Sequence, residues 1–587
     1  MFFQFNTMEH PQHNGQAWQR NSSLSHQPNR WDWMALPVIL GILFFIAFGA
    51  SQMATPYQVG MPLQITLDPL YLPYYLLRTT LRMMMALMLS LVFAFVFAAM
   101  ASRYRLAEKI MVPALDILQS IPVLGFLTIT VTGFITLFPG SLLGVECAAI
   151  FAIFTSQAWN MAFSMYQSMR TVPSDLREAA RIFHLSSWQR FWRLELPFAM
   201  PSLLWNMMMS MSGGWFFVVA CETITVANNN IQLPGIGSYI AYAINEGNFS
   251  AMGWAIGAML LGILMYDQLL FRPLIAWANK FKYEQTGDQG GQESWFLTLL
   301  RRTNALKGLT ARFMDYFGRG LLLFKRNYDG TSIMARRQRI NPTIERVSDA
   351  IIAALVLFAC WKIGSYIQSA VGWSEVIRVF WFGFLTFMRV AIMITLASLI
   401  WVPIGVWIGL NPKYAERLQP VAQFMAAVPV NFMFPLVVIV LLKFDLNPDI
   451  WLTPLMVFGT QWYILFNVIA GASMIPTELI YAADNFGLTK WMRWKRFLLP
   501  AIFPSFITGA ITASGGSWNA SIVSEYVTWD NNTLIATGIG SYIAQVTAIG
   551  DFPRVALGIS VMCFFVIACN RFIWRRFYRI AEEKMSF

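Results

Sequence analysis

The chain has 587 residues, of which 57% are hydrophobic and only 12% are charged. This composition excludes a soluble globular protein of this length and indicates an integral membrane protein. The formal net charge of +12 does not indicate nucleic-acid binding, because polytopic membrane proteins collect Lys and Arg in their cytoplasmic loops. The five cysteines show no paired spacing, so neither a disulfide framework nor a metal site is expected.

Residues 1–33 are polar and lack the basic, apolar and small-residue pattern of a cleaved signal peptide. We therefore expect a cytoplasmic N-terminal tail. A first repeat is expected at 34–276, because its apolar runs are long enough to cross a hydrocarbon core about 30 Å thick and its Lys and Arg recur in alternate loops. Its six spans are expected at 34–50, 79–101, 110–138, 142–165, 201–226 and 251–275.

Residues 277–346 form a basic segment of different character, expected to be a cytoplasmic linker. Apolar residues from Trp295 to Phe317 recur there at helical spacing with Arg and Lys between them. That pattern is typical of an amphipathic helix on an anionic membrane surface, and a helix packed on the protein itself fits it as well. A second repeat follows at 347–587, with spans expected at 347–367, 382–410, 418–442, 451–472, 501–527 and 555–572. Both termini then lie in the cytosol.

The two halves repeat each other in register. Thr79 and Arg82 correspond to Thr386 and Arg389 at an offset of 307, and the heptapeptide 235–241 recurs identically at 538–544 at an offset of 303. An even number of spans in each half makes the repeats parallel. We therefore predict an all-α membrane protein of about twelve transmembrane helices, with pseudo-twofold symmetry about the membrane normal and a pathway between its halves.

A short polar segment between the fourth and fifth spans also occurs twice. The first copy contains Glu178-Ala179-Ala180 and ends at Leu196-Pro197, and the second contains Tyr481-Ala482-Ala483 with Gly487 and ends at Leu499-Pro500. These copies resemble the EAA motif of binding-protein-dependent ABC importer permeases with the type I importer fold. His184 stands where the family has Gly, and Tyr481 replaces the Glu.

The conformational preferences of these residue types fit a short helix followed by a second helix. The paired alanines favour a helix with a small surface, Gly487 can end that helix at a positive φ, and Pro197 and Pro500 can start the next one. The resemblance implies that each copy is a coupling helix that docks on a separate ATPase. It also implies two ABC ATPase subunits on the cytoplasmic side, an external substrate-binding protein, and a place in the bacterial cytoplasmic (inner) membrane.

The chain contains no Gly-x-x-x-x-Gly-Lys-Ser/Thr string, so we expect no ATPase site of its own and no enzymatic activity. It should bind no cofactor, because ATP is hydrolysed by the partner subunits.

Ionisable residues within spans are candidates for the pathway, because their burial in lipid is costly. Glu222 and Glu525 correspond at an offset of 303, and each follows a corresponding tryptophan, Trp215 or Trp518. These residues and the arginines Arg82 and Arg389 are the pathway candidates. Each Glu could instead fix helix packing by bonding backbone or an Arg, and each Arg could pair with a Glu, extend to the interface or attract an anion.

The pattern of Ser-Gly-Gly, Trp and Glu in the fifth spans resembles the nitrate, sulfonate, taurine and bicarbonate branch, which implies a small, anionic solute. The alternatives left open are an ion-coupled secondary transporter or channel, and a membrane scaffold or receptor that keeps the permease fold.

Overall fold

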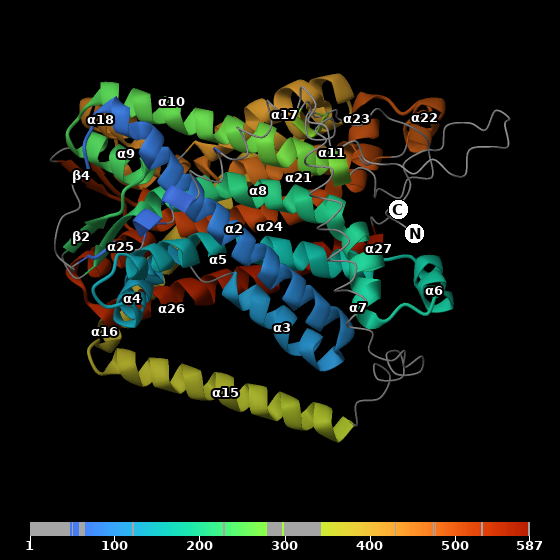
Figure 1. Ribbon diagram of the computed structural model, residues 1–587, viewed down its shortest axis with the longest axis horizontal. Helices are drawn as coiled ribbons and strands as arrows, with labels where there is room; N and C mark the ends of the chain where they lie inside the picture. The colour runs from blue at the N-terminus through green and yellow to red at the C-terminus, as the bar shows by residue number, and fades with distance from the viewer. Residues whose placement is uncertain are drawn as a thin grey trace, which may run out of the picture.

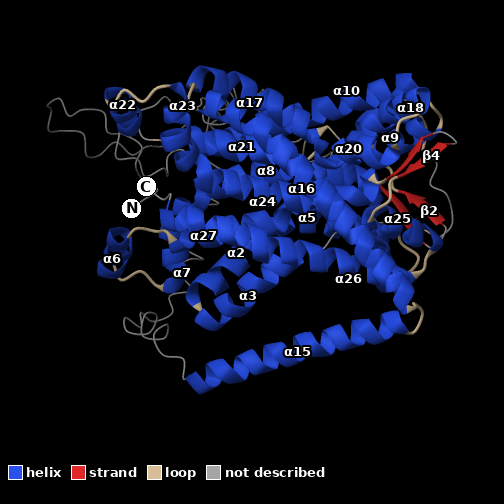
Figure 2. Cartoon of the chain, turned by 180° about the vertical axis from the view of Figure 1, so that it is seen from behind, coloured by secondary structure: helices blue, strands red, loops and turns tan. Residues whose placement is uncertain are grey.

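The computed structural model describes residues 41, 47–49, 51–53, 55–57, 65–119, 123–226, 229–278, 296–298, 342–428, 430–473, 475, 477–529 and 532–584. The expected N-terminal tail lies outside the described residues, as do most of the first expected span and nearly all of the basic linker. The structure is a bundle of helices with two small β-hairpins at one end (Figures 1 and 2).

In the first repeat, after the helical residues 47–49 and 51–53, a 3₁₀ turn, Pro69–Tyr71, leads into the long helix α2. Its further helices pack around α2 and α5, and its elements are α2 (Leu72–Arg103), α3 (Arg105–Leu118), α4 (Val123–Leu137), α5 (Leu143–Arg170), α6 (Ser174–Ile182), α7 (Ser187–Arg190), a π-helical turn (Phe191–Glu195), α8 (Leu196–Glu222), β1 (Thr223–Val226), β2 (Asn229–Gln232), α9 (Ile236–Asn245), α10 (Phe249–Tyr266), a π-helical turn (Asp267–Phe271) and α11 (Arg272–Ala278).

The second repeat has a similar order of elements after its first helix, α15, except that α19, α20 and α21 stand where the first repeat has the single helix α5, and a 3₁₀ turn precedes α18. It consists of α15 (Pro342–Gln368), α16 (Trp373–Gly409), α17 (Pro412–Ala427), a 3₁₀ turn (Val430–Met433), α18 (Phe434–Phe444), α19 (Pro448–Trp451), α20 (Thr453–Phe458), α21 (Gln461–Ser473), α22 (Thr477–Asn485), α23 (Lys490–Arg493), a π-helical turn (Trp494–Leu498), α24 (Leu499–Ser524), β3 (Tyr526–Trp529), β4 (Asn532–Ile535), α25 (Ile539–Ile549), α26 (Phe552–Cys569), a π-helical turn (Asn570–Trp574) and α27 (Arg575–Lys584).

Five described helices are long and apolar enough to cross a membrane: Pro69–Arg103, Phe249–Ala278, Trp373–Gly409, Trp491–Ser524 and Phe552–Phe577. The helices Pro448–Phe458 and Gln461–Ser473, bent by 40° at their junction, would make a sixth. The all-α membrane class is confirmed, and among the described residues the two hairpins hold the only strands. The total of twelve spans stays a prediction.

Two of the expected spans extend too far. The fifth spans were expected at 201–226 and 501–527, but α8 ends at Glu222 and α24 at Ser524. A strand of four residues follows, directly in the first copy and after Glu525 in the second, and it pairs in an antiparallel hairpin, β1 with β2 and β3 with β4. The strands are rich in Thr, Val, Ile and aromatic residues, which fit a pleated strand better than a helix.

Corresponding polar side chains begin the last long helix of each repeat. Asn248 accepts a hydrogen bond from the Ala251 N–H at 3.0 Å at the start of α10. Asp551 does the same for the Arg554 N–H at 3.2 Å at the start of α26. These N-caps satisfy backbone donors that a helix start leaves open, so the repeats share capping as well as helix order.

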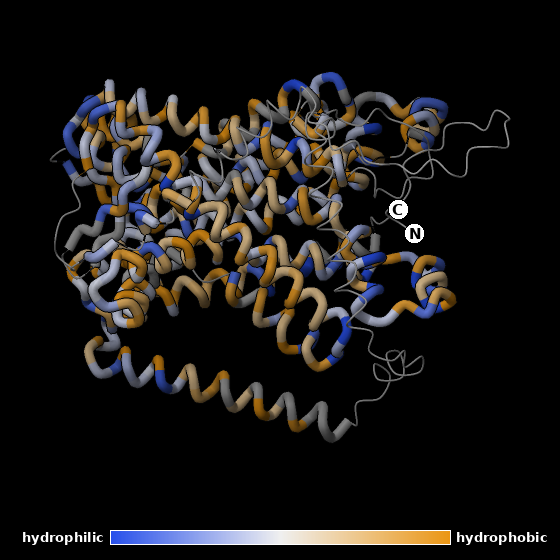
Figure 3. The backbone as a smooth tube through the Cα atoms, viewed as in Figure 1, coloured by the Kyte–Doolittle hydropathy of each residue, from blue (hydrophilic) through white to orange (hydrophobic). Residues whose placement is uncertain are grey.

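Each half has its own apolar core, and the halves also pack on each other. The first core contains Met83, Met161 and Trp215, and the second contains Ile464, Trp518 and Val561. Across the interface, α4 packs on α24, α25 and α26, while α17 packs on α8 and α10. The bundle is largely apolar along its length, with hydrophilic segments gathered toward its ends (Figure 3). Because lipid would cover the outer faces, exposed apolar residues such as Leu357 and Trp361 on the outlying helix α15 are expected in a membrane protein.

Candidate functional site

The two polar segments that resemble coupling helices form α6 and α22. Both lie at the end of the molecule opposite the β-hairpins (Figures 1 and 2). In α6, Glu178 is exposed, Ala179 is half-buried and Ala180 is buried at 6% exposure. In α22, Tyr481 is 67% exposed, Ala482 is half-buried and Ala483 is buried at 4%. The second alanine of each pair thus packs on its own chain, and the residue at the Glu position faces outward.

Both short helices end in the same backbone motif. Gly487 has φ +62° and His184 has φ +49°, which is the left-handed conformation that ends many helices. The His184 N–H donates to the Arg181 carbonyl at 2.9 Å and the Leu185 N–H to the Ala180 carbonyl at 3.0 Å. The corresponding bonds in α22 run from Gly487 to Asp484 and from Leu488 to Ala483.

The positive φ predicted for Gly487 is therefore confirmed. His184 adopts the conformation that the family motif assigns to Gly, although a side chain makes it costly by about 1 kcal/mol.

Pro197 and Pro500 stand in the first turn of the α-helices α8 and α24, as predicted, but the chain is already helical before them. Helical structure begins nine or more residues earlier, at Ser187 and Lys490, and continues through a π-helical turn into α8 or α24. In the first copy, a capping box joins Ser186 and Gln189 and fixes that start. The π-helical turn shifts the hydrogen-bond register just before the proline, whose missing N–H would otherwise interrupt the ladder.

The first pair of pathway candidates, Arg82 and Glu222, lies in a fully buried ionic network. Arg82 binds a Glu222 carboxylate oxygen at 2.6 Å and both oxygens of Glu146 at 2.5 and 2.8 Å. Arg78 also donates to Glu146 at 2.5 Å. The four side chains are 0–1% exposed, and they carry two positive and two negative charges. Pairing with Glu222 is thus the alternative that Arg82 adopts.

Neutral donors complete the coordination of Glu222. The Thr79 hydroxyl donates to one carboxylate oxygen at 2.6 Å and the Gly237 N–H to the other at 2.6 Å. The Thr79 hydroxyl oxygen in turn accepts from the Ile236 N–H at 3.0 Å. The carboxylate therefore joins α2, α8 and the start of α9, and its geometry matches the packing role considered from the sequence.

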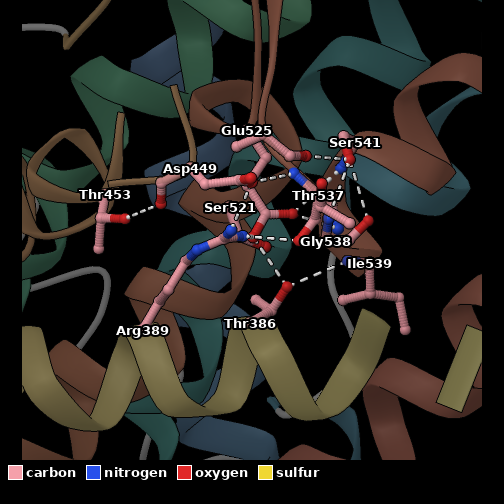
Figure 4. Close-up of polar contacts among 12 residues, drawn as sticks. Thr386, Arg389, Asp449, Thr453, Ser521, Glu525, Thr537, Gly538, Ile539 and Ser541 are labelled. Carbon is pink, nitrogen blue, oxygen red and sulfur yellow. Dashed lines mark hydrogen bonds and ion pairs between the residues drawn. The ribbon is translucent and has the colours of Figure 1, made fainter. Parts of the chain in front are cut away.

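The second pair, Arg389 and Glu525, repeats this arrangement in a more open form (Figure 4). Glu525 accepts from the Thr386 hydroxyl at 2.7 Å, from Arg389 at 3.0 Å and from the Gly540 N–H at 2.8 Å. Arg389 also binds Asp449 at 2.9 Å. The Glu525 side chain is fully buried, whereas those of Arg389 and Asp449 are 13% and 43% exposed.

These networks explain the glycine that begins the identical heptapeptide. A Cβ on Gly235 would stand 2.3 Å from the Glu222 carboxyl carbon, and one on Gly538 would stand 2.2 Å from a Glu525 oxygen. Each repeat therefore needs Gly at this position because the carboxylate touches the backbone.

Alignment of the two repeats did not identify Glu146, Asp449 or Arg78 as candidate site residues. Glu146 and Asp449 correspond at the offset of 303. Treating Asp and Glu as equivalent when the repeats are aligned would therefore have identified this pair. Arg78 could not be identified in this way, because Leu385 occupies the corresponding position.

A cavity of about 110 Å³ lies between the halves. The first half lines it from α5, from α8 and from Gln119, and the second half from α21, α24, α26 and the π-helical turn after α26. Its walls include Thr155, Trp159, Asn160, Tyr463, Gly515 and Trp518. Of the six predicted pathway residues, only Trp518 is among the described residues that line it. Trp215, its counterpart, packs edge-on against Tyr266 with ring centroids 6.1 Å apart. Within the described ranges, no group of three His, Cys, Asp or Glu could hold a metal ion.

Comparison with known families and proteins gives consistent matches. The family model described as "Binding-protein-dependent transport system inner membrane component" matches residues 90–270 and again 401–587. A bicarbonate transport system permease protein of Synechococcus elongatus is 29% identical over 149 residues, which is 25% of this chain and 52% of the relative.

A nitrate import permease protein of Leptolyngbya laminosa is 28% identical over 154 residues, or 26% of this chain and 50% of the relative. A taurine transport system permease protein of Escherichia coli is 24% identical over 139 residues, or 24% and 49%. The chain spans about half the length of the curated relatives it matches.

Proposed function

Because the chain belongs to the family of binding-protein-dependent transport system inner membrane components, we propose that it supplies both halves of the permease of an ABC importer in one chain. It carries a small oxyanion inward between its halves, receives that solute from an external binding protein, and is driven by two separate ATPase subunits. The family match occurs twice along the chain, which supports a fusion of two units that pair around one pathway.

The observation that carries the proposal is the pair of exposed helices α6 and α22 at one end of the bundle (Figure 1). Each presents large apolar side chains to its surroundings. Ile182 and Phe183, both 74% exposed, lie at the end of α6, and Tyr481 and Phe486 are 67% and 83% exposed on and beside α22. Because these segments are polar helices outside the apolar bundle, lipid is a poor explanation for that exposure, and a protein partner is a better one. In this proposal the ATPase subunits are the partners that bind α6 and α22.

The same end of the molecule faces the cytosol in this proposal. The C-terminal helix α27 lies at that end (Figures 1 and 2) and begins with Arg575 and Arg576, as the positive-inside rule favours. The hairpins at the opposite end then face the external binding protein.

The solute class is drawn from the relatives, whose names specify bicarbonate, nitrate and taurine. All three solutes carry an anionic group of oxygens. The proposal assigns the same chemistry to this chain.

The test replaces Ala179 and Ala482 separately by Glu and measures how much ATPase co-purifies from the native membrane. A carboxylate placed in a docked groove without a partner should weaken association at least about tenfold. Thr528→Glu is the matched control, because it adds the same charge at an exposed position of β3 at the opposite end. Unchanged association in both alanine variants, or no ATP-dependent uptake by wild-type vesicles supplied with the ATPases and binding protein, would reject the importer assignment.

A further inference from the structure

The last membrane-crossing helix of the second repeat continues beyond its apolar part into four arginines. The chain stays helical through α26, the π-helical turn after it and α27, and α27 lies at the end of the bundle opposite the hairpins (Figures 1 and 2). Residues 555–570 hold no charged side chain and cover about 24 Å, most of a hydrocarbon core about 30 Å thick. The residues that follow therefore lie at the boundary between lipid and cytosol. They include the arginine cluster, which consists of Arg571, Arg575, Arg576 and Arg579.

The cluster continues the face of α26 that is turned away from the protein. Phe564 and Ile567 are 56% and 37% exposed on α26, and Phe572 is 63% exposed in the turn after it. Arg571 lies four residues after Ile567, and Arg575 lies four residues after Arg571, which is the spacing of neighbours on one helix face. Because lipid covers an exposed apolar face of a spanning helix, the same face carries these guanidinium groups into the layer of lipid headgroups.

The four guanidinium groups are exposed and unpaired. They form no hydrogen bond or ion pair with any residue that the structure describes. By contrast, Arg554 near the outer end of the same helix binds both Glu375 and Asp551. Like charges four residues apart destabilise a helix, so an anion placed against the cluster would stabilise α27.

The first repeat offers an internal comparison, because the corresponding turn and helix lack the cluster. At the offset of 303, three of the four arginines correspond to the uncharged residues Gln268, Pro273 and Ala276. The fourth corresponds to Arg272, which binds Asp267 at 2.9 Å. The shared fold thus does not require these charges, and they distinguish the second half from the first.

Exposed apolar side chains accompany the arginines on α27. Phe577 and Ile580 are 42% and 38% exposed, and their spacing of three residues places them on one face. A helix of this kind at the membrane boundary binds anionic lipid, because its apolar side chains enter the acyl region while its basic side chains meet the phosphates. Guanidinium groups suit phosphate oxygens, since they donate two parallel hydrogen bonds. The continuity with a lipid-covered face favours a lipid over an ATPase, which is assigned to α6 and α22.

We propose that the arginine cluster binds the phosphate headgroups of anionic phospholipid in the cytoplasmic leaflet. The site belongs to the second half alone. It goes beyond the proposed importer function and depends on neither the solute nor the ATPases.

The first experiment measures lipid binding to the purified full chain by native mass spectrometry, with phosphatidylglycerol and phosphatidylcholine of identical acyl chains. Each basic residue near an anionic surface contributes about fivefold in affinity. Replacing all four arginines of the cluster by Gln should therefore weaken binding of the first phosphatidylglycerol at least about tenfold and leave phosphatidylcholine binding unchanged. Replacing all four by Lys keeps the charge and should change the affinity less than about threefold.

The matched control removes the same charge from exposed positions on other helices. Four basic residues of α16, α17 and α18 are replaced by Gln, and binding of the first phosphatidylglycerol should weaken less than about threefold. These residues are Arg378, Lys413, Arg417 and Lys443. Equal losses in the cluster variant and the control would overturn the site, because net charge alone would then explain the binding.

Inorganic phosphate and the ATPases are tested as other occupants of the cluster. Added inorganic phosphate should leave phosphatidylglycerol bound, and its displacement would overturn the lipid assignment in favour of a free-phosphate site. The Gln variant of the cluster should co-purify with the same amount of ATPase as wild type. Loss of the ATPases with unchanged phosphatidylglycerol binding would assign the cluster to a protein partner instead. Failure of the lipid site alone would leave the importer function standing.

The second experiment locates the lipid in the otherwise unchanged chain. A photoreactive benzoylphenylalanine replaces Phe572 in vesicles that contain both lipids, and the captured lipid is identified by mass. Phosphatidylglycerol should be captured at least about threefold above its share of the vesicle, and high salt should remove this enrichment by screening the charges. The control places the same group at Leu269, the corresponding half-buried residue of the first repeat, where capture should follow the lipid mixture. Equal enrichment at both positions would contradict a site specific to the second half.

Discussion

The two ionic networks differ in charge balance, and that difference yields a quantitative prediction. The first holds Arg78 and Arg82 against Glu146 and Glu222, all of them buried. Replacing Glu146 by Gln leaves two buried guanidinium groups facing one carboxylate. Removing one partner of a buried ion pair costs about 3–5 kcal/mol, because the remaining charge is uncompensated.

The corresponding change in the second network should cost far less. Asp449→Asn leaves Arg389 paired with Glu525, and the Asp449 side chain is 43% exposed. Exposed ion pairs contribute about 0–1 kcal/mol. The asparagine oxygen can still accept from the Thr537 N–H, which lies 2.6 Å from Asp449.

The assay is the melting temperature of the purified chain in detergent. For a folding unit of 150–250 residues, 1 kcal/mol shifts this temperature by about 2–4 °C, so Glu146→Gln should lower it by at least about 6 °C and Asp449→Asn by less than about 4 °C. The double variant Arg78→Leu/Glu146→Gln should recover most of the loss. It restores charge balance and introduces the residue type that the second repeat has at Leu385. Equal shifts in the two single variants, or no recovery in the double variant, would refute the charge-balance argument.

The remaining predictions concern backbone positions. His184→Gly should relieve the strain of the positive φ of +49° and slow amide exchange at the end of α6 about fivefold, because about 1 kcal/mol of backbone strain is removed. Gly487→Ala, at φ +62°, should introduce similar strain and speed amide exchange in α22 by a similar factor. Changes of the same sign in the two variants would contradict this. Gly538→Ala should greatly lower the yield of folded protein, because its Cβ would stand 2.2 Å from a Glu525 oxygen. Gly459→Ala, where a Cβ meets nothing within 4 Å, should express normally, and a Gly538→Ala protein that folds and melts like wild type would disprove the close-contact explanation.

Local sequence patterns were enough to predict the membrane-protein class, the two repeats and the positive φ at Gly487. Apolar run length identified a membrane protein, because the bilayer sets that length. A constant offset revealed the repeats, since matched residues keep their register wherever no insertion intervenes. The positive φ of Gly487 followed from its place after a short helix, because the left-handed conformation depends on only one residue's backbone.

Helix boundaries at the ends of α8 and α24 could not be read in this way. The apolar run continues through residues 223–226, and only hairpin pairing with 229–232 makes those residues a strand. A hydrophobic segment can form either a helix or a strand, so the segment that it pairs with decides between the two.

Tertiary structure alone determined which polar residues meet. Arg82 bonds to residues 64 and 140 positions away along the chain, and no local pattern encodes a contact over that distance. The sequence offered Glu222 as either a pathway group or a packing group. The fold closes Gly235 and Gly237 onto its carboxylate and supplies an arginine, which satisfies it within the protein. The cavity likewise exists only because α5 of one half faces α24 of the other, and its uncharged wall arises from residues that carry no signal separately.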